Sequence, residues 1–175
     1  MLNFFIKFKQ LIRYSLPTFF VLFFTFFNIL VSKNFFDFGV FIALHGIFFW
    51  FFYTPNLLPP FIILILGFLH DVIYLLPLGS TSLIFLLSIL LIQAYKEFFL
   101  EPSFFEIWIS FVVIFSISIF CSWALISLIR FAYLPIEPIL FKIFINLLIF
   151  PFTYIFLYYF FNKLRLEKIS RNKNV

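Results

Sequence analysis

The sequence predicts an all-α integral membrane protein, with about six transmembrane helices in one bundle. Three observations predict this class. Of the 175 residues, 65% are hydrophobic and only 11% are charged, whereas a globular domain carries about 25% charged residues. The apolar residues form six long runs with short breaks between them, and the basic residues gather near the chain ends. Because this number of charged residues is too small to cover a water-exposed surface, lipid is the expected solvent.

Six apolar runs set the expected spans. A membrane-spanning helix needs about 20 mostly apolar residues, with a range of about 17 to 25. The runs occupy residues 16–31, 35–52, 61–76, 81–95, 105–130 and 139–161. The second is the weakest, because Asp37, His45 and Gly46 interrupt it. No loop is long enough to fold independently, so we expect a polytopic membrane domain, residues 1–162, and a basic tail, residues 163–175.

The first run has the basic leader of a signal peptide, with Lys7, Lys9 and Arg13 before it. Its end, ILVSKNFF, lacks a small-x-small cleavage site, and more spans follow. We therefore expect an uncleaved first helix.

The distribution of Lys and Arg predicts that both termini are cytoplasmic. With six spans and an inner N-terminus, nine basic residues lie inside and three lie outside, namely Lys33, Arg130 and Lys142. This bias follows the positive-inside rule, and an even number of spans returns the basic tail to the same side as the N-terminus. The tail also suits membrane lipids as a partner, at about 1 kcal/mol for each basic residue near anionic headgroups. A simple stop-transfer cluster explains the same charges.

The stretch GFLHDVIYLLPLG places an ionisable pair inside the third run. The residues that we expect to form a polar seam for structure or partner binding are Gly67, His70, Asp71, Tyr74, Pro77 and Gly79. Asp71 precedes Pro77 by six residues, or about 9 Å of helix. A charge at the centre of a spanning helix costs about 2.5–3.5 kcal/mol, so such groups usually face a bundle interior or a cavity. Gly67, Asp71 and Tyr74 share one helix face, and Gly67 allows another helix to approach closely.

Three interpretations of Asp71 stay open: a structural hydrogen bond, a contact point for a partner, and proton or cation coupling with His45 or His70. We favour a hydrogen-bonded hinge near the outer surface. On this hypothesis Asp71→Asn keeps most of the function and Asp71→Leu does not.

Other residues of the runs have simpler expected roles. Ser118 and Ser122 form a small-xxx-small pair for helix packing, and Pro151 should kink or break the last helix. Trp50 and Trp108 are expected to anchor at membrane interfaces.

The sequence offers little for catalysis. It has four glycines in scattered positions, a single cysteine (Cys121) and two histidines, so it lacks a phosphate loop, a paired-thiol metal site and a dense polar constellation. We expect no catalytic residue, no metal, no cofactor and no nucleic-acid partner.

Two stretches, WFFYTPNLLPP (50–60) and LGFLHDVIYLLPLGSTSL (66–83), resemble the MreD family of rod-shape-determining membrane proteins, particularly its alphaproteobacterial form. The first stretch matches the family in a loop motif at Trp50, Tyr53, Pro55, Leu57, Leu58 and Pro59, and the second at Gly67, Asp71, Pro77, Leu78 and Gly79. The chain departs from the family at two places. The family often has charged residues where this chain has Thr54 and Asn56, and it often has glycines where this chain has Tyr74, Leu75 and Leu76.

The resemblance implies a non-enzymatic inner-membrane component of the cell-elongation machinery, which builds peptidoglycan in rod-shaped cells. Its implied partners are MreC-like and MreB-like proteins and a RodA-like polymerase with its penicillin-binding protein. The family is also thought to share its six-helix form with substrate-capturing subunits of vitamin transporters. The alternative is therefore a small-molecule-binding subunit of a membrane transporter, and a lipid-modifying enzyme is a third interpretation.

The charge bias yields a first prediction. A reporter that is active only in the periplasm should stay silent when fused at Val175 and become active when fused near Ser80, because six spans return the tail to the cytoplasm. Activity at Val175 would mean that one span is miscounted, in which case the run at 35–52 is the first to re-examine.

Overall fold

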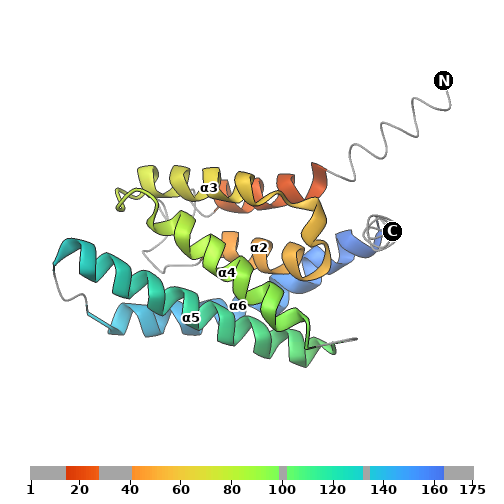
Figure 1. Ribbon diagram of the computed structural model, residues 1–175. Coiled ribbons are helices and arrows are strands. Elements are labelled where there is room, and N and C mark those ends of the chain that lie inside the picture. The colour runs from red at the N-terminus through yellow and green to blue at the C-terminus, as the bar shows by residue number, and fades with distance from the viewer. Residues whose placement is uncertain (1–14, 28–40, 99–101, 132–134, 164–175) are drawn as a thin grey trace, which may run out of the picture.

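The computed structural model describes residues 15–27, 41–98, 102–131 and 135–163, and its regular elements are all helical. The all-α class is therefore confirmed for this part of the chain (Figure 1). In order, the helices are an N-terminal helix (Ser15–Phe27), α2 (Ile42–Tyr53), the 3-10 turn η1 (Pro55–Leu57), α3 (Pro60–Ile73), α4 (Ser80–Lys96), α5 (Phe104–Arg130) and α6 (Glu137–Lys163).

Helices lie in each of the six apolar runs. The bounds of α4, α5 and α6 differ by at most two residues from the predicted 81–95, 105–130 and 139–161, whereas α3 ends at Ile73, three residues early. Residues 28–31 and 35–40 of the first two predicted spans, and the tail after residue 163, lie outside the described residues.

Among the described residues, two helices, α5 and α6, are long and apolar enough to cross a membrane by themselves, at 27 residues each. Within the described residues, the four shorter apolar helices have 12 to 17 residues, which is at most about 26 Å of helix against a hydrocarbon core of about 30 Å. These two helices support a membrane protein, while six complete crossings remain a prediction.

The short helix α2 forms the centre of the bundle, between α4 and α6. Every residue from Ala43 to Phe52 is buried. Aromatic side chains of neighbouring helices pack around α2. Among them, the rings of Phe111 on α5 and Phe150 on α6 stack with their centroids 3.8 Å apart. His45 and Gly46, which interrupt this apolar run, are both buried and contact protein on the neighbouring helices.

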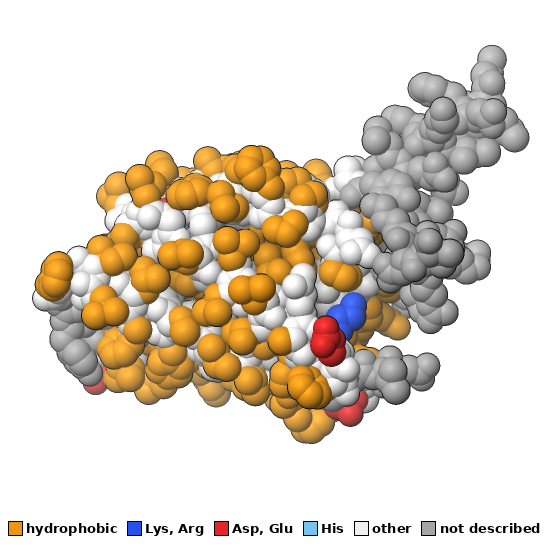
Figure 2. All heavy atoms as spheres, in the orientation of Figure 1, with side chains coloured by type: hydrophobic (Ala, Val, Ile, Leu, Met, Phe, Trp, Pro, Cys, Tyr) orange, Lys and Arg blue, Asp and Glu red, His pale blue; other side chains and the backbone are white. Residues whose placement is uncertain are grey.

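The exterior is predominantly apolar. Large hydrophobic side chains such as Phe61, Phe98 and Phe152 are more than two-thirds exposed. Orange side chains cover much of the face shown in Figure 2, and the few charged ones visible lie towards the ends of the helices. An apolar surface of this extent is unusual for a soluble monomer and is suited to lipid or to protein partners.

The helices α3 and α4 are tightly packed at Gly67. A Cβ atom added there would lie 2.5 Å from the Cα and 2.6 Å from the backbone nitrogen of Ser82. The Ser82 hydroxyl donates to the carbonyl of Leu64 at 2.9 Å, which joins the two helices beside this contact. The close approach expected at Gly67 is therefore present, and its partner is α4.

Helix α6 continues through Pro151, so it is not broken there. A proline at this position leaves the carbonyl of Leu147 without its helical amide donor. The indole Nε1–H of Trp108 donates to that carbonyl at 3.3 Å from α5. Trp108, which we expected at a membrane interface, thus supplies the hydrogen bond that Pro151 removes.

The contact at Gly67 yields a second prediction. Gly67→Ala should lower the free energy of unfolding by about 1–3 kcal/mol, because the new methyl group meets backbone that cannot move aside. Thermal unfolding of the purified full chain in detergent measures this loss.

Gly46→Ala is the matched control. Its Cβ would meet a side chain, the Phe24 ring 2.9 Å away, and not backbone, and alanine is favoured over glycine in helices by about 0.8–1.0 kcal/mol. Gly46→Ala should therefore lose less unfolding free energy than Gly67→Ala. Equal unfolding temperatures for Gly67→Ala and the wild type would show that the α3–α4 contact is not tight.

Candidate functional site

The carboxylate of Asp71 joins the end of α3 to the start of α4. It is fully buried. Its Oδ2 accepts the backbone N–H of Gly79 at 2.8 Å, and its Oδ1 accepts the backbone N–H of Thr81 and the hydroxyl of Ser80, each at 3.0 Å. The first N–H groups of a helix have no acceptor within the helix. Because the N-cap residue Gly79 has no side chain, Asp71 caps α4 from the neighbouring helix.

The turn between the two helices is built to reach this geometry. The N–H of Leu76 donates to the carbonyl of Asp71 at 2.9 Å, which closes the end of α3. Leu75 takes a left-handed conformation with φ 52°, and Gly79 has φ 91°. A left-handed leucine costs about 1–2 kcal/mol. The bend is therefore formed without the glycines that the MreD family often has before the proline.

His70 extends the same junction towards α2. Its ring stacks on Tyr74 at 4.3 Å between centroids and meets the edge of Phe41 at 5.2 Å. Its Nδ1 lies 3.3 Å from the hydroxyl oxygen of Thr81. Through His70 the end of α3 is in contact with the starts of both α2 and α4.

A second helix start is capped in the same manner. The backbone N–H of Phe41, at the start of α2, donates to Oδ1 of Asn146 on α6 at 2.8 Å. The amide nitrogen of Asn146 donates to the carbonyl of Lys142 at 2.6 Å, and the ammonium of Lys142 lies 4.9 Å from the centroid of the Phe41 ring. The starts of α2 and α4 thus depend on side chains of other helices.

The residues of the predicted polar seam, Gly67 to Gly79, all lie along the α3–α4 hairpin. Four of them lie where the end of α3 meets the start of α4, namely His70, Asp71, Tyr74 and Gly79. The loop motif lies at the opposite end of α2. There the hydroxyl of Thr54 donates to the carbonyl of Trp50 at 3.2 Å, and the hydroxyls of Tyr53 and Tyr154 share a hydrogen bond at 2.6 Å. The structure therefore does not bring the two motifs together.

The prolines of the loop motif set the path between α2 and α3. Pro55 begins the turn η1, and Pro59 stands at the N-cap of α3 in extended backbone. Trp50, expected at a membrane interface, is instead fully buried. It packs against Phe20 and Phe49, because the centre of α2 is enclosed by protein on all sides.

The two histidines have different surroundings. Nδ1 of His45 lies 3.0 Å from the hydroxyl oxygen of Thr153 on α6, and its ring edge meets Phe111 and Phe150. His70 contacts α2 and α4 instead. The two histidines therefore contact different neighbours: His45 lies against α5 and α6, and His70 lies against α4 and the start of α2.

Sequence reasoning missed several polar partners. Asn146 was not singled out, although an amide in the run FINLL is unusual enough to have been noticed. Ser118 was expected at a helix interface, but its partner, the Ser88 hydroxyl 2.7 Å away on α4, was not. The described residues contain no group of three or more His, Cys, Asp and Glu side chains that could hold a metal ion.

No protein family model, curated protein or solved structure matches the chain. The site is therefore interpreted from its own geometry.

The capping geometry yields a third prediction and corrects an expectation. Both oxygens of Asp71 accept hydrogen bonds, so Asp71→Asn would place an NH₂ group against an N–H or O–H donor. We now expect Asp71→Asn to lose about 1–3 kcal/mol of unfolding free energy. Asp71→Leu should lose more, because it leaves the N–H groups of Gly79 and Thr81 without an acceptor. Thermal unfolding of the full chain in detergent measures both.

Glu97→Gln is the control for the change in net charge, since Glu97 is exposed at the end of α4. If Asp71→Leu unfolded at the wild-type temperature, the carboxylate would not hold the hairpin.

Proposed function

We propose that the protein is a non-enzymatic, multi-pass component of the bacterial inner membrane that supports cell elongation, as MreD-like proteins do. The observation that carries the proposal is the bonding of Asp71. This residue, with Gly67, Pro77 and Gly79, supports the resemblance to the family, and it acts within the chain by capping α4. A motif whose polar group is fully used for internal bonds suits a scaffold, which needs a defined shape and no reactive group.

The proposed partners are MreC-like and MreB-like proteins and a RodA-like polymerase with its penicillin-binding protein. With cytoplasmic termini, the α3–α4 turn would face the periplasm, on the side where an MreC-like protein lies. Leu75 and Leu78 on that turn are highly exposed, while the Asp71 bonds hold the backbone beneath them. A rigid turn with apolar side chains at its tip supports a contact with another protein or with the membrane surface.

The proposal yields a fourth prediction, on cell shape. Depletion of the protein in its own host should round or swell the cells and disperse new peptidoglycan synthesis, because the elongation machinery would lose a membrane component. Microscopy with a fluorescent D-amino acid measures both effects. Re-expression of the wild type should restore rods, and the Glu97→Gln variant serves as a second positive control.

The alternative, a substrate-binding subunit of a transporter, predicts a different outcome. Normal shape together with lost uptake of one nutrient would favour that alternative and contradict the scaffold.

A further inference from the structure

The turn between α3 and α4 presents hydrocarbon to its surroundings. Within the described segment 41–98, the exposed residues between Asp71 and Ser80 are Val72, Ile73, Leu75 and Leu78. Leu75 is 85% exposed and Leu78 is 72% exposed. The hydroxyls of Ser80 and Thr81 are buried and face groups of α3. The turn therefore has its polar groups inside and aliphatic groups outside, which is the reverse of a turn that faces water.

The backbone of the turn is bonded within the chain. The N–H groups that donate to acceptors of α3 or of the turn itself are those of Tyr74, Leu76, Gly79, Ser80 and Thr81. Asp71 accepts three of them, with its carbonyl from Leu76 and with its carboxylate from Gly79 and Thr81. In hydrocarbon, backbone polar groups have to be satisfied within the protein, because lipid tails do not form hydrogen bonds. Asp71 thus makes this bend suited to a region without water.

The sequence of this connection differs from that of the other two connections that are predicted on the outer side. Residues 72–95 contain no Asp, Glu, Lys, Arg or His. The connection after the first predicted span contains Lys33 and Asp37, and the connection from α5 to α6 is flanked by Arg130 and Glu137. Charged residues keep a connection in water or among lipid headgroups, because they are costly in hydrocarbon. Of the three connections, the one from α3 to α4 is without this restraint.

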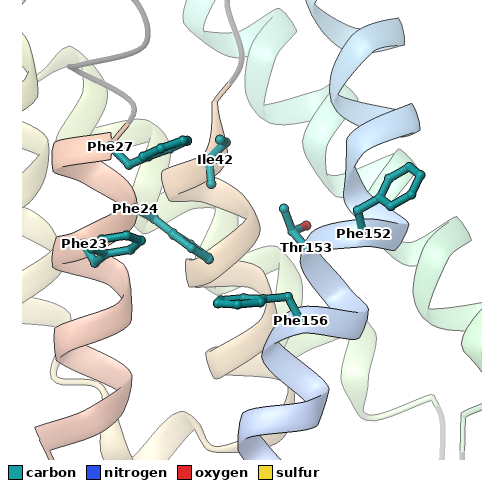
Figure 3. Close-up of a pocket in the computed structure, with 7 residues that line it drawn as sticks. All are labelled: Phe23, Phe24, Phe27, Ile42, Phe152, Thr153 and Phe156. Carbon is teal, nitrogen blue, oxygen red and sulfur yellow. The ribbon is translucent and has the colours of Figure 1, made fainter.

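Exposed apolar groups elsewhere on the bundle lie along the sides of helices. An example is the open groove between the N-terminal helix and α6, which Phe23, Phe27 and Phe152 line (Figure 3). Such a position suits lipid and a protein partner equally. Leu75 and Leu78 lie at the end of a hairpin instead, where a surface in water is normally polar. Their exposure therefore indicates that this end of the hairpin does not face water.

The hairpin is also too short to carry its tip out of the membrane. In the predicted orientation Lys96 marks the inner end of α4, and the 17 residues of α4 cover about 26 Å of a hydrocarbon core of about 30 Å. The neighbouring α5 reaches further outward. From the contact of Ser88 with Ser118, α4 extends about 12 Å to Ser80. In the same direction α5 extends about 18 Å to Arg130, and in Figure 1 the turn stops short of that end of α5.

We propose that the α3–α4 hairpin is re-entrant, with its tip, residues 74–78, in the hydrocarbon of the outer leaflet and covered by lipid. The lipids above the tip lie closer to the bilayer centre, so the membrane is thinner there. The tip still points to the periplasmic side, so a reporter fused near Ser80 is expected to be active. The inference rests on the membrane location and orientation in the proposed function and is independent of the cell-shape role.

The fifth prediction places the tip by the accessibility of spin labels. In a Cys121→Ser background, single labels are attached through Leu78→Cys at the tip, Leu90→Cys on the exposed face of α4 and Phe131→Cys at the end of α5. The full chain is reconstituted in liposomes of dioleoyl phosphatidylcholine and phosphatidylglycerol. Collisions of each label are measured with oxygen, which concentrates in hydrocarbon, and with a water-soluble nickel chelate. The oxygen-to-nickel ratio at Leu78→Cys should lie within about twofold of Leu90→Cys and at least about fivefold above Phe131→Cys.

A thinner bilayer tests the depth of the tip separately from the fold. In liposomes of dimyristoleoyl lipids the ratio at Leu78→Cys should fall at least about threefold, because the tip emerges, while the ratio at Leu90→Cys stays unchanged. Leu75→Cys repeats both measurements if Leu78→Cys fails to fold.

Three results would each overturn the re-entrant hairpin. The first is a tip label as open to nickel in dioleoyl lipids as Phe131→Cys, which is expected of a tip that is kept in water for a protein partner. The second is dipolar broadening between two Leu78→Cys labels, which would show that a second copy covers the tip. The third is a ratio that does not change with bilayer thickness. Rod-shaped cells after depletion would overturn the cell-shape role alone.

Discussion

The structure depends on supplying acceptors to backbone N–H groups at helix starts that water does not reach. An unpaired backbone group in apolar surroundings costs several kcal/mol. Helix α5 begins at an exposed position and meets this need locally, with a capping box between Ser103 and Glu106. Helix α2 begins at the buried Phe41, and α4 begins at the half-buried Gly79 with its first residues, Ser80 and Thr81, buried; neither Phe41 nor Gly79 makes a capping side-chain bond. Asn146 and Asp71 supply the acceptors from neighbouring helices.

Capping from another helix has a consequence that a local cap does not. A bond such as Asp71 to Thr81 fixes the start of α4 and also fixes the position of α3 beside it. The contact of Gly67 with Ser82 then sets the spacing of the pair, and the hydroxyls of Ser88 and Ser118 align α4 with α5. Apolar packing alone tolerates many arrangements, and a chain with 35 phenylalanines offers many. The few polar contacts between helices select one of these packing arrangements.

The sequence predicted the class of fold because composition and run length determine it almost alone. It also located α4, α5 and α6 to within two residues, since proline, glycine or charge bounds each run. It placed Asp71 and Gly67 at a helix contact, because polar and small residues within apolar runs have few other uses. It did not identify α2 as the central helix, or Trp50 as buried, because hydropathy is equally high for a residue facing lipid and one facing protein. The partners Asn146 and Ser88 depend on tertiary neighbours, which periodicity does not specify.

The direction of the polar groups explains what kind of recognition the surface can offer. Asp71, Asn146, Thr153 and Ser118 all bond inward, to backbone or to side chains of adjacent helices. Their bonding capacity is used for the fold, so the outer faces of these helices present mainly hydrocarbon. In a membrane such faces gain little from hydrophobicity, because lipid is equally apolar, and they must discriminate by shape. The turn that ends in the exposed Leu75 and Leu78 is such a feature of shape, and it depends on the inward bonds of Asp71 that hold α3 and α4 in place.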